Sequence, residues 1–250
     1  MASKKYGIAE TFCSLQGEGL YTGTRMHFIR FSGCSVGKKL TDEEREKFLA
    51  LEDPSHQYKG TQLPMYREKC TLYDGREFCC DTNFQTAKAM TVEEIMAEIP
   101  DGVKHICLTG GEPLDRDLSE LLDYIAEETD YKVHIETSGT VSMKKAWPEF
   151  SPEFNNMGEE TDWIWITVSP KKNVLPEMVE MANEIKLLVD ESFSLDRVPL
   201  TILGHELVWL QPVNYEWDVN QENVKRCLTI LEQFPNWRIS MQMHKLWRCR

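Results

Sequence analysis

The stretch that decides the fold runs from residue 104 to residue 139 and reads KHICLTGGEPLDRDLSELLDYIAEETDYKVHIETSG. It opens with a nearly continuous apolar run over 104–109, which is typical of a strand buried on both faces of a parallel sheet. A helix is predicted over 118–128, because Asp117 can cap it and apolar residues recur at helical spacing along it. A second apolar run over 132–136 follows. Strand, helix and strand in this order predict parallel strands.

Similar apolar runs recur on both sides of this stretch, at residues 26–31, 162–168, 184–189, 206–211 and 237–242. Helices are predicted between them over 92–99, which Thr91 and Glu94 open with a capping box, and over 221–234, which Pro235 ends. This alternation predicts an α/β fold, either a parallel sheet or a barrel, in a single domain over residues 1–250. In such folds the functional site lies at the carboxyl ends of the strands.

The segment 35–79 interrupts the alternation and is interpreted as an insertion in a loop. Residues 38–69 are rich in charged and turn-forming residues, and a short helix is predicted from Thr41 to about Leu51. Near the end of the segment, the pair Asp74-Gly75 is typical of a type I′ turn between two hairpin strands. Such a hairpin would place Cys70 opposite Cys79.

The charge balance excludes some classes of partner. The chain has 28 Lys and Arg residues against 41 Asp and Glu residues, a formal net charge of −13. Binding to nucleic acid or to an anionic membrane is therefore not expected, since either needs a basic surface. No apolar run is long enough to cross a bilayer, and the first residues, MASKKYGIAETF, lack the apolar core of a signal peptide. A cytoplasmic protein is expected.

The cysteines point to a metal centre. Of the eight cysteines, four lie from Cys34 to Cys80, and in a reducing cytoplasm such a group more often binds a metal or cluster than forms disulfides. Cys34 follows a predicted strand directly, where an α/β fold builds its site. Soft thiolates suit an iron–sulfur cluster. Cys107, Cys227 and Cys13 are interpreted as structural cysteines.

A Gly-Gly pair stands where the strand at 104–109 meets the next helix. Gly110 and Gly111 would let a polar group of a ligand approach the main chain. The surrounding sequence has neither the Gly-Lys-Ser/Thr of a P-loop nor the glycine spacing of a dinucleotide-binding fold. The pair indicates a ligand contact of another kind, or an ordinary turn.

Several short motifs follow one another in order from residue 7 to the last residue. They are LQGEG (15–19), FIRFSGC (28–34), CDT (80–82), TGGEP (109–113), IETSG (135–139), VSPK (168–171), NEIK (183–186), LQP (210–212) and WRISMQMHK (237–245). This series resembles the 7-carboxy-7-deazaguanine synthase family of radical S-adenosylmethionine enzymes, and only the segment from about 35 to 79 has no counterpart. The resemblance implies a partial, open parallel β/α barrel with an insertion in its cluster-binding loop.

The resemblance also implies an activity and its cofactors. Enzymes of this family are lyases that convert 6-carboxy-5,6,7,8-tetrahydropterin to 7-carboxy-7-deazaguanine with loss of ammonia, a step toward queuosine and other 7-deazaguanines. The implied cofactors are a 4Fe–4S cluster held by three cysteines, S-adenosyl-L-methionine bound at the fourth iron, and Mg²⁺. Cleavage of S-adenosylmethionine yields the radical that starts the rearrangement. An electron donor such as flavodoxin and a homodimer are the implied partners.

The family's site residues carry over onto matching positions of this sequence. The substrate-binding positions are Leu15, Gln16, Gly17, Arg30, Thr109 and the terminal carboxylate of Arg250. The S-adenosylmethionine-binding positions are Gly111, Glu112, Ser138, Ser169, Pro170, Lys171, Gln211, Pro212, Val213 and Asn214. Thr82 matches the magnesium ligand, a hard oxygen of the kind that Mg²⁺ prefers. The fork of Arg30 suits the substrate carboxylate, and Glu112 would hold the methionine amino group.

The chain departs from the family in its cysteine spacing. The usual Cys-x3-Cys-x2-Cys is absent, and Glu77 stands three residues before Cys80, where a thiolate is expected. With Cys34 and Cys80 as the outer ligands, Cys70 or Cys79 is the middle one. Cys70 is favoured because a hairpin returns it beside Cys80, whereas two adjacent cysteines would have to reach different irons. A structural zinc bound by Cys70, Cys79 and a neighbour is a lesser alternative.

Two other functions stay open from the sequence. Another radical S-adenosylmethionine activase or pterin enzyme would use the same cofactor, but the matches at 15–19 and at Arg30 speak against it. A non-catalytic, zinc-stabilised binding protein built around the 35–79 insertion would carry zinc in place of iron. Iron and sulfide analysis separates these classes.

Overall fold

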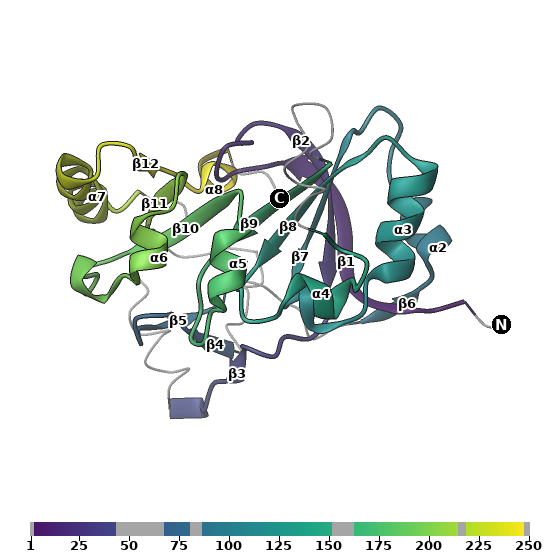
Figure 1. The fold of residues 1–250 in the computed structure, drawn as a ribbon, viewed down its shortest axis with the longest axis horizontal. Helices are drawn as coiled ribbons and strands as arrows, with labels where there is room; N and C mark the ends of the chain where they lie inside the picture. Colours follow the sequence, from purple (N-terminus) through teal and green to yellow (C-terminus); the bar gives the residue numbers. More distant parts are fainter. Residues whose placement is uncertain (1–2, 44–67, 81–86, 152–162, 215–218, 248–250) are drawn as a thin grey trace, which may run out of the picture.

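A computed structural model describes residues 3–43, 68–80, 87–151, 163–214 and 219–247 (Figure 1). Within them, the main feature is a nine-stranded sheet in the order β12-β11-β10-β9-β8-β7-β2-β1-β6. Its strands are β1 (Tyr6–Leu15), β2 (Arg25–Phe31), β6 (Lys88–Met90), β7 (His105–Gly110), β8 (Lys132–Thr137), β9 (Ile164–Val168), β10 (Glu184–Val189), β11 (Val208–Pro212) and β12 (Arg238–Ile239). A second sheet, drawn below it in Figure 1, holds β3 (Lys38–Lys39), β4 (Glu68–Thr71) and β5 (Glu77–Cys79).

The main sheet is mostly parallel. Neighbouring strands from β2 to β12 pair in parallel, whereas β1 runs antiparallel to both β2 and β6. The predicted α/β fold is therefore confirmed, and the described strands form an open sheet, not a closed barrel. The sequence did not predict β1 or β6, because β1 mixes apolar residues with Glu10, Thr11 and Ser14 and is only partly buried.

The helices are α2 (Val92–Met96), α3 (Ser119–Glu128), α4 (Met143–Ala146), α5 (Pro176–Glu180), α6 (Leu200–Leu203), α7 (Gln221–Gln233) and α8 (Met243–Trp247). In Figure 1, α5 and α6 lie in front of the strands, and α3 lies at the right, beside β1. The hydrophobic core joins Leu121, Leu122 and Ile125 of α3 to sheet residues such as Ile106 and Ile135. Each fully buried side chain of this kind contributes about 1.5–3 kcal/mol to folding, which makes the core the main support of the sheet.

The helix ends differ in detail from the predictions. The capping box of Thr91 and Glu94 is present, but α2 ends at Met96. The N-cap of α3 is Leu118, and Asp117 instead accepts a hydrogen bond from the backbone N–H of Ser119 at 2.9 Å. The helix predicted from residue 41 to about 51 falls almost wholly outside the described residues. No helix of the described ranges is both long and apolar enough to cross a membrane.

The other face of the sheet carries a row of polar side chains. The strand register places Arg30 beside Thr109, Glu136 beside Thr167, and Thr167 beside Glu184. Thr109 Oγ1 also donates to Glu136 Oε2 at 3.3 Å, so these five residues form one row across β2, β7, β8, β9 and β10. We call them the polar row. Because side chains alternate along a strand, these strands present apolar residues to the helices, while the opposite face carries the polar row beside a small apolar cluster of Met26, Phe28 and Cys107.

The β4–β5 hairpin has a different turn from the one predicted. The N–H of Gly75 donates to the carbonyl of Leu72 at 3.0 Å, and the N–H of Leu72 donates to the carbonyl of Arg76 at 2.8 Å. Gly75 has a φ of 89°, whereas the φ of Asp74 is not positive, which excludes a type I′ turn at this pair. The loop therefore has three residues instead of two.

The longer loop shifts the pairing of the hairpin by one residue. Cys70 pairs with Phe78, and Cys79 pairs with Lys69, so the expected placement of Cys70 opposite Cys79 is wrong. A one-residue shift moves a side chain to the other face of the ladder. The shift therefore decides which residues share a face with Cys70.

Candidate active site

A cavity of about 410 Å³ lies at the carboxyl ends of the parallel strands, between the polar row and the β4–β5 hairpin. It is lined by residues that the sequence singled out, namely Leu15, Gln16, Gly17, Arg30, Cys34, Cys70, Cys80, Thr109, Gly111, Glu112, Ser138, Ser169 and Lys171. Others lie outside its lining: Pro170, Gln211, Pro212, Val213 and Asn214. Thr82 and Arg250 fall outside the described residues.

Three thiols line this one cavity, those of Cys34, Cys70 and Cys80. The N–H of Cys80 donates to the carbonyl of Glu68 at 2.9 Å, which continues the ladder in which Cys70 pairs with Phe78. Since side chains alternate along a strand, Cys80 shares the face of Phe78 and hence that of Cys70. The hairpin thus brings two thiols to one face, and the loop after β2 adds the third.

This donor set fits an iron–sulfur cluster. In the described ranges, no three His, Cys, Asp or Glu side chains converge closely enough to hold a single metal ion. A 4Fe–4S cube binds each thiolate at a different iron, so its ligands surround it and need not meet at one point. Burial raises the pKa of the Cys34 thiol, and a bound cation is what would favour its thiolate. The side chain of Cys79 is outside the described part of the chain.

The Gly-Gly pair packs the strand ends together. A Cβ atom on Gly111 would lie 1.6 Å from the carbonyl oxygen of Gly33, and one on Gly110 would lie 2.5 Å from the backbone nitrogen of Phe31. Gly110 also has a φ of 111°, which other residues rarely adopt. The glycines therefore admit the loop that carries Cys34, which Ser35 further fixes through its backbone N–H to Asp115 Oδ2 at 2.7 Å.

Glu112 is held in place by four donors. Its Oε1 accepts from Thr137 Oγ1 at 2.6 Å and from the N–H of Leu114 at 3.2 Å. Its Oε2 accepts from the N–H of Ser138 at 2.8 Å and from the Ser138 hydroxyl. Glu112 is only 1% exposed, yet it lines the cavity.

Arg30 reaches the cavity from β2. Its Nε donates to Glu10 Oε1 at 2.8 Å, and its guanidinium lies 5.8 Å from the ring centre of Phe12. Glu10 pairs with Arg30 across β1 and β2, so the two strands themselves set the position of this ion pair. The arrangement fixes a guanidinium beside the cavity, where it suits a carboxylate ligand.

An ionic cluster also lines the cavity: the buried Lys186, the largely buried Glu18 and the partly exposed Glu136. Lys186 Nζ lies 2.5 Å from Glu18 Oε2 and 3.7 Å from Glu136 Oε1. Glu18 Oε1 accepts from the amides of Gln211 at 3.2 Å and Gln242 at 3.0 Å. Burial alone would raise the pKa of Glu18, but Lys186 and the amide of Gln242 help to lower it to about 2. The charges of Glu18 and Glu136 in turn raise the pKa of Lys186 despite its burial.

The sequence analysis did not predict this ionic cluster, although all three residues belong to motifs that it singled out. Glu18, Glu136 and Lys186 belong to the motifs LQGEG, IETSG and NEIK. Glu136 and Lys186 interrupt apolar strands, where a charge needs a partner if it is buried. Gln211 does not line the cavity, but its side-chain amide donates to Glu18, which does.

Three cysteines lie away from this cavity. Cys107 and Cys227 are fully buried, and burial raises the pKa of both thiols, that of Cys227 to about 12. Cys13 is half-buried, with its sulfur 3.7 Å from Nδ1 of His27. These positions agree with their interpretation as structural cysteines.

Comparisons with known proteins give one consistent result. Residues 70–170 match the model of the radical SAM superfamily. The chain is 31% identical to the 7-carboxy-7-deazaguanine synthase of Buchnera aphidicola, over 98% of this chain and 99% of that protein. It is 30% identical to the enzyme of the same name from Escherichia coli K12, over 96% and 97% of the two chains. The crystal structure of QueE from Escherichia coli matches with a TM-score of 0.59 and 27% identity, covering 95% of this chain and 93% of that one.

Proposed function

The chain belongs to the 7-carboxy-7-deazaguanine synthase family of radical S-adenosylmethionine enzymes, and we propose that it converts 6-carboxy-5,6,7,8-tetrahydropterin to 7-carboxy-7-deazaguanine with loss of ammonia. The observation that carries this proposal is a single cavity lined by three thiols, those of Cys34, Cys70 and Cys80, and by the guanidinium of Arg30. The three thiols suit the iron–sulfur cluster, and the guanidinium suits the substrate carboxylate.

When bound, the 4Fe–4S cluster and S-adenosylmethionine supply radical chemistry that begins with removal of a hydrogen atom from the substrate. Cys34, Cys70 and Cys80 hold the cluster. Glu112 holds the methionine amino group with a carboxylate that Thr137 and Ser138 orient. Further S-adenosylmethionine contacts come from Gly111, Ser138, Ser169 and Lys171 in the cavity lining, and from Pro170, Gln211, Pro212, Val213 and Asn214 in the segments at the ends of β9 and β11.

The substrate lies beside Arg30, which binds its carboxylate while Glu10 fixes the guanidinium through Nε. Leu15, Gln16, Gly17 and Thr109 line the same cavity and contact the substrate there. Arg250, which lies outside the described residues, is a further proposed substrate contact. A pterin ring presents N–H donors, and Glu18 and Glu136 supply acceptor carboxylates in the cavity wall.

The proposal includes Mg²⁺, a reductant and a partner subunit. Thr82 provides a hydroxyl ligand to Mg²⁺, which keeps several waters and binds the substrate's oxygens. A flavodoxin-type protein donates the electron, and the chain forms a homodimer. We place the protein in the cytoplasm, because an iron–sulfur cluster and free thiols persist in a reducing compartment.

Anaerobic reconstitution followed by a product assay tests the function. The full chain should bind about four irons with matching sulfide, as a single cubane requires. Incubation with the carboxy-tetrahydropterin, S-adenosylmethionine, Mg²⁺ and a reductant should then yield 7-carboxy-7-deazaguanine. Zinc without iron, or an iron-loaded chain that forms no such product, would contradict the proposal.

Two cysteine variants identify the middle ligand. Cys70→Ala should prevent assembly of the cluster, because it removes a thiol of the cavity lining, whereas Cys79→Ala should retain it. Iron content and the visible absorbance of the reconstituted chains measure both. The opposite pattern would assign the ligand to Cys79 and contradict the hairpin argument.

A further inference from the structure

The β4–β5 hairpin, which carries Cys70 and is followed directly by Cys80, is attached to the main sheet at two places. One attachment is a backbone pairing. Leu72 forms a bridge with Lys171, and the N–H of Lys172 donates to the carbonyl of Thr71 at 2.8 Å. This bridge lies two residues from Cys70 and joins the hairpin to the loop after β9.

The second attachment is the side chain of Arg76. Its Nη1 lies 2.7 Å from Asp190 Oδ1, and its Nη2 donates to the carbonyl oxygen of Leu188 at 2.8 Å. Leu188 is the next-to-last residue of β10, and Asp190 directly follows that strand. Arg76 Nε lies 2.6 Å from Asp74 Oδ2, within the hairpin loop itself. One guanidinium therefore binds the hairpin turn and the carboxyl end of a main-sheet strand together.

This contact is buried and has specific geometry. The side chains of Arg76 and Asp74 are 6% and 0% exposed, and that of Asp190 is 12% exposed. The guanidinium lies 5.2 Å from the ring centre of Phe193, which follows β10, and 5.7 Å from that of Phe78 on β5. A planar fork with several donors can bind two carboxylates and a carbonyl at once, which a lysine ammonium cannot reproduce.

The position of the hairpin sets the positions of two proposed cluster ligands. Cys70 lies on β4 and Cys80 follows β5, whereas Cys34 is carried by the main sheet. We propose that Arg76 is a positioning residue for the iron–sulfur cluster, which it serves by holding the β4–β5 hairpin at a fixed distance from Cys34. This inference rests on the proposed function, since it assumes that the three thiols bind a cluster.

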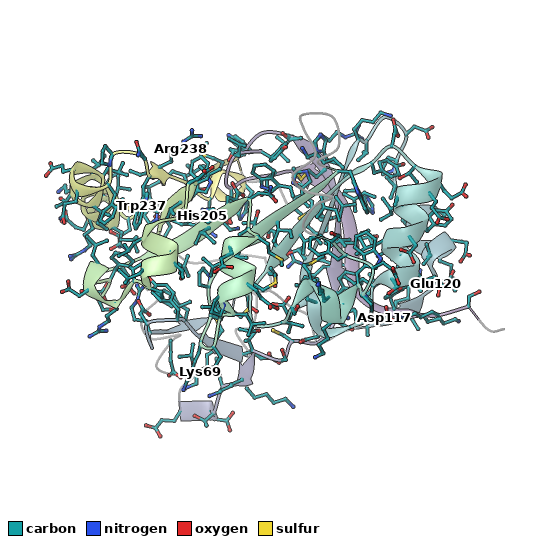
Figure 2. The ribbon with its side chains drawn as sticks, in the orientation of Figure 1. Lys69, Asp117, Glu120, His205, Trp237 and Arg238 are labelled. Atoms are coloured by element: carbon teal, nitrogen blue, oxygen red, sulfur yellow. The ribbon has the colours of Figure 1, made fainter. Side chains whose placement is uncertain are left out.

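Rates of iron loss from the reconstituted, full-length chain test the proposal. Arg76→Gln removes both ion pairs, and we expect it to lose iron to a chelator at least about tenfold faster than the wild type, in line with outer-shell changes at metal sites. Arg76→Lys keeps the positive charge but not the planar fork of donors, so its rate of iron loss should lie between those of the wild type and Arg76→Gln. Glu77→Gln is the matched control, because it breaks the Lys69–Glu77 pair of the same hairpin, in which Glu77 is 44% exposed, and leaves both ion pairs of Arg76 in place. Figure 2 shows Lys69 in the lower part of the view, on the second sheet.

A second measurement separates positioning from general stability. Thermal unfolding of each iron-free variant reports the fold, whereas the electron paramagnetic resonance signal of the reduced protein reports the cluster environment. We expect Arg76→Gln to change both the iron-loss rate and this signal. If Arg76→Gln does not fold, Asp190→Asn, which keeps the side-chain volume and removes one ion pair, should still show the faster iron loss.

The outcomes distinguish this inference from the proposed function. A wild-type chain that takes up no cubane cluster contradicts the function itself. A wild-type chain that loads normally while Arg76→Gln and Asp190→Asn lose iron at its rate overturns only the role of Arg76. A lower unfolding temperature with an unchanged iron-loss rate and spectrum would likewise make Arg76 purely structural.

Discussion

Replacing Lys186 with methionine should destabilise the fold strongly. The ammonium of Lys186 lies 2.5 Å from Glu18 and 3.7 Å from Glu136, and its side chain is only 8% exposed. Methionine fills a similar volume but leaves two carboxylates close together without a cation. Breaking a buried pair in this way costs about 3–5 kcal/mol, a large part of the about 5–15 kcal/mol by which a typical domain is stable.

Urea unfolding of the iron-free chain measures this loss. With a slope of about 3 kcal/mol per molar urea for a chain of this length, the midpoint should fall by about 1–1.7 M. Lys225→Met is the matched control. Its ion pair with Glu222 spans 2.7 Å, but the two side chains are 68% and 70% exposed. Such a surface pair contributes about 0–1 kcal/mol, so the control should shift the midpoint little.

A double variant sharpens the test. Glu18→Gln together with Lys186→Met removes one of the two unpaired carboxylates, and the amide can still bond to neighbouring polar groups. We expect the double variant to regain part of the stability that Lys186→Met loses. A Lys186→Met chain that unfolds at the wild-type midpoint, or a double variant less stable than the single one, would refute the assignment of this cluster as a buried, charge-balanced unit.

Three further predictions follow from the site. The fold lowers the pKa of Glu18 to about 2, from an ordinary value of 4.5. The ionised carboxylate therefore contributes stability above pH 4.5, and this contribution is lost as the pH falls toward 2. Acid unfolding should show this loss in the wild type and less of it in Glu18→Gln. Gly111→Ala should displace the Cys34 loop, because a Cβ atom would lie 1.6 Å from the carbonyl oxygen of Gly33. After reconstitution this variant should bind clearly less iron than the control Gly23→Ala. A Cβ atom at Gly23 meets no atom within 4 Å, although the φ of 89° adds strain there. Arg30→Gln should lower kcat/KM for the pterin about 10–100-fold, as the loss of a charge-assisted hydrogen bond does, and should leave the iron content unchanged. A parallel fall in iron content would show instead that Arg30 supports the cluster.

Sequence reasoning succeeded where a residue pattern has one structural solution. The buried runs over 104–109 and 132–136 are β7 and β8, because few other elements bury such continuous apolar segments. The order of the motifs placed Cys34, Glu112 and Ser138 near one another, since each follows a parallel strand at the same edge of the sheet.

The missed features depend on details that a local pattern does not contain. The pair Asp74-Gly75 suits several turns, and no local pattern shows that Arg76, at the end of the three-residue loop, bonds to Asp190 and Leu188 more than a hundred residues away. The partners of Lys186 likewise come from Glu18 and Glu136, far apart in the sequence. A charged residue in a strand indicates that a partner exists, but only the strand order identifies it.

The short strand β3 gives the chain a place where its length can change at low cost. Lys38 pairs with Lys69 and Lys39 pairs with Glu68, so the two ends of the stretch 40–67 are held at adjacent positions. The entropy of closing a loop grows only with the logarithm of its length, about 0.6 kcal/mol for each doubling. A change in the number of residues between these paired ends should therefore cost little in loop-closure entropy, as long as the pairing of β3 with β4 is kept.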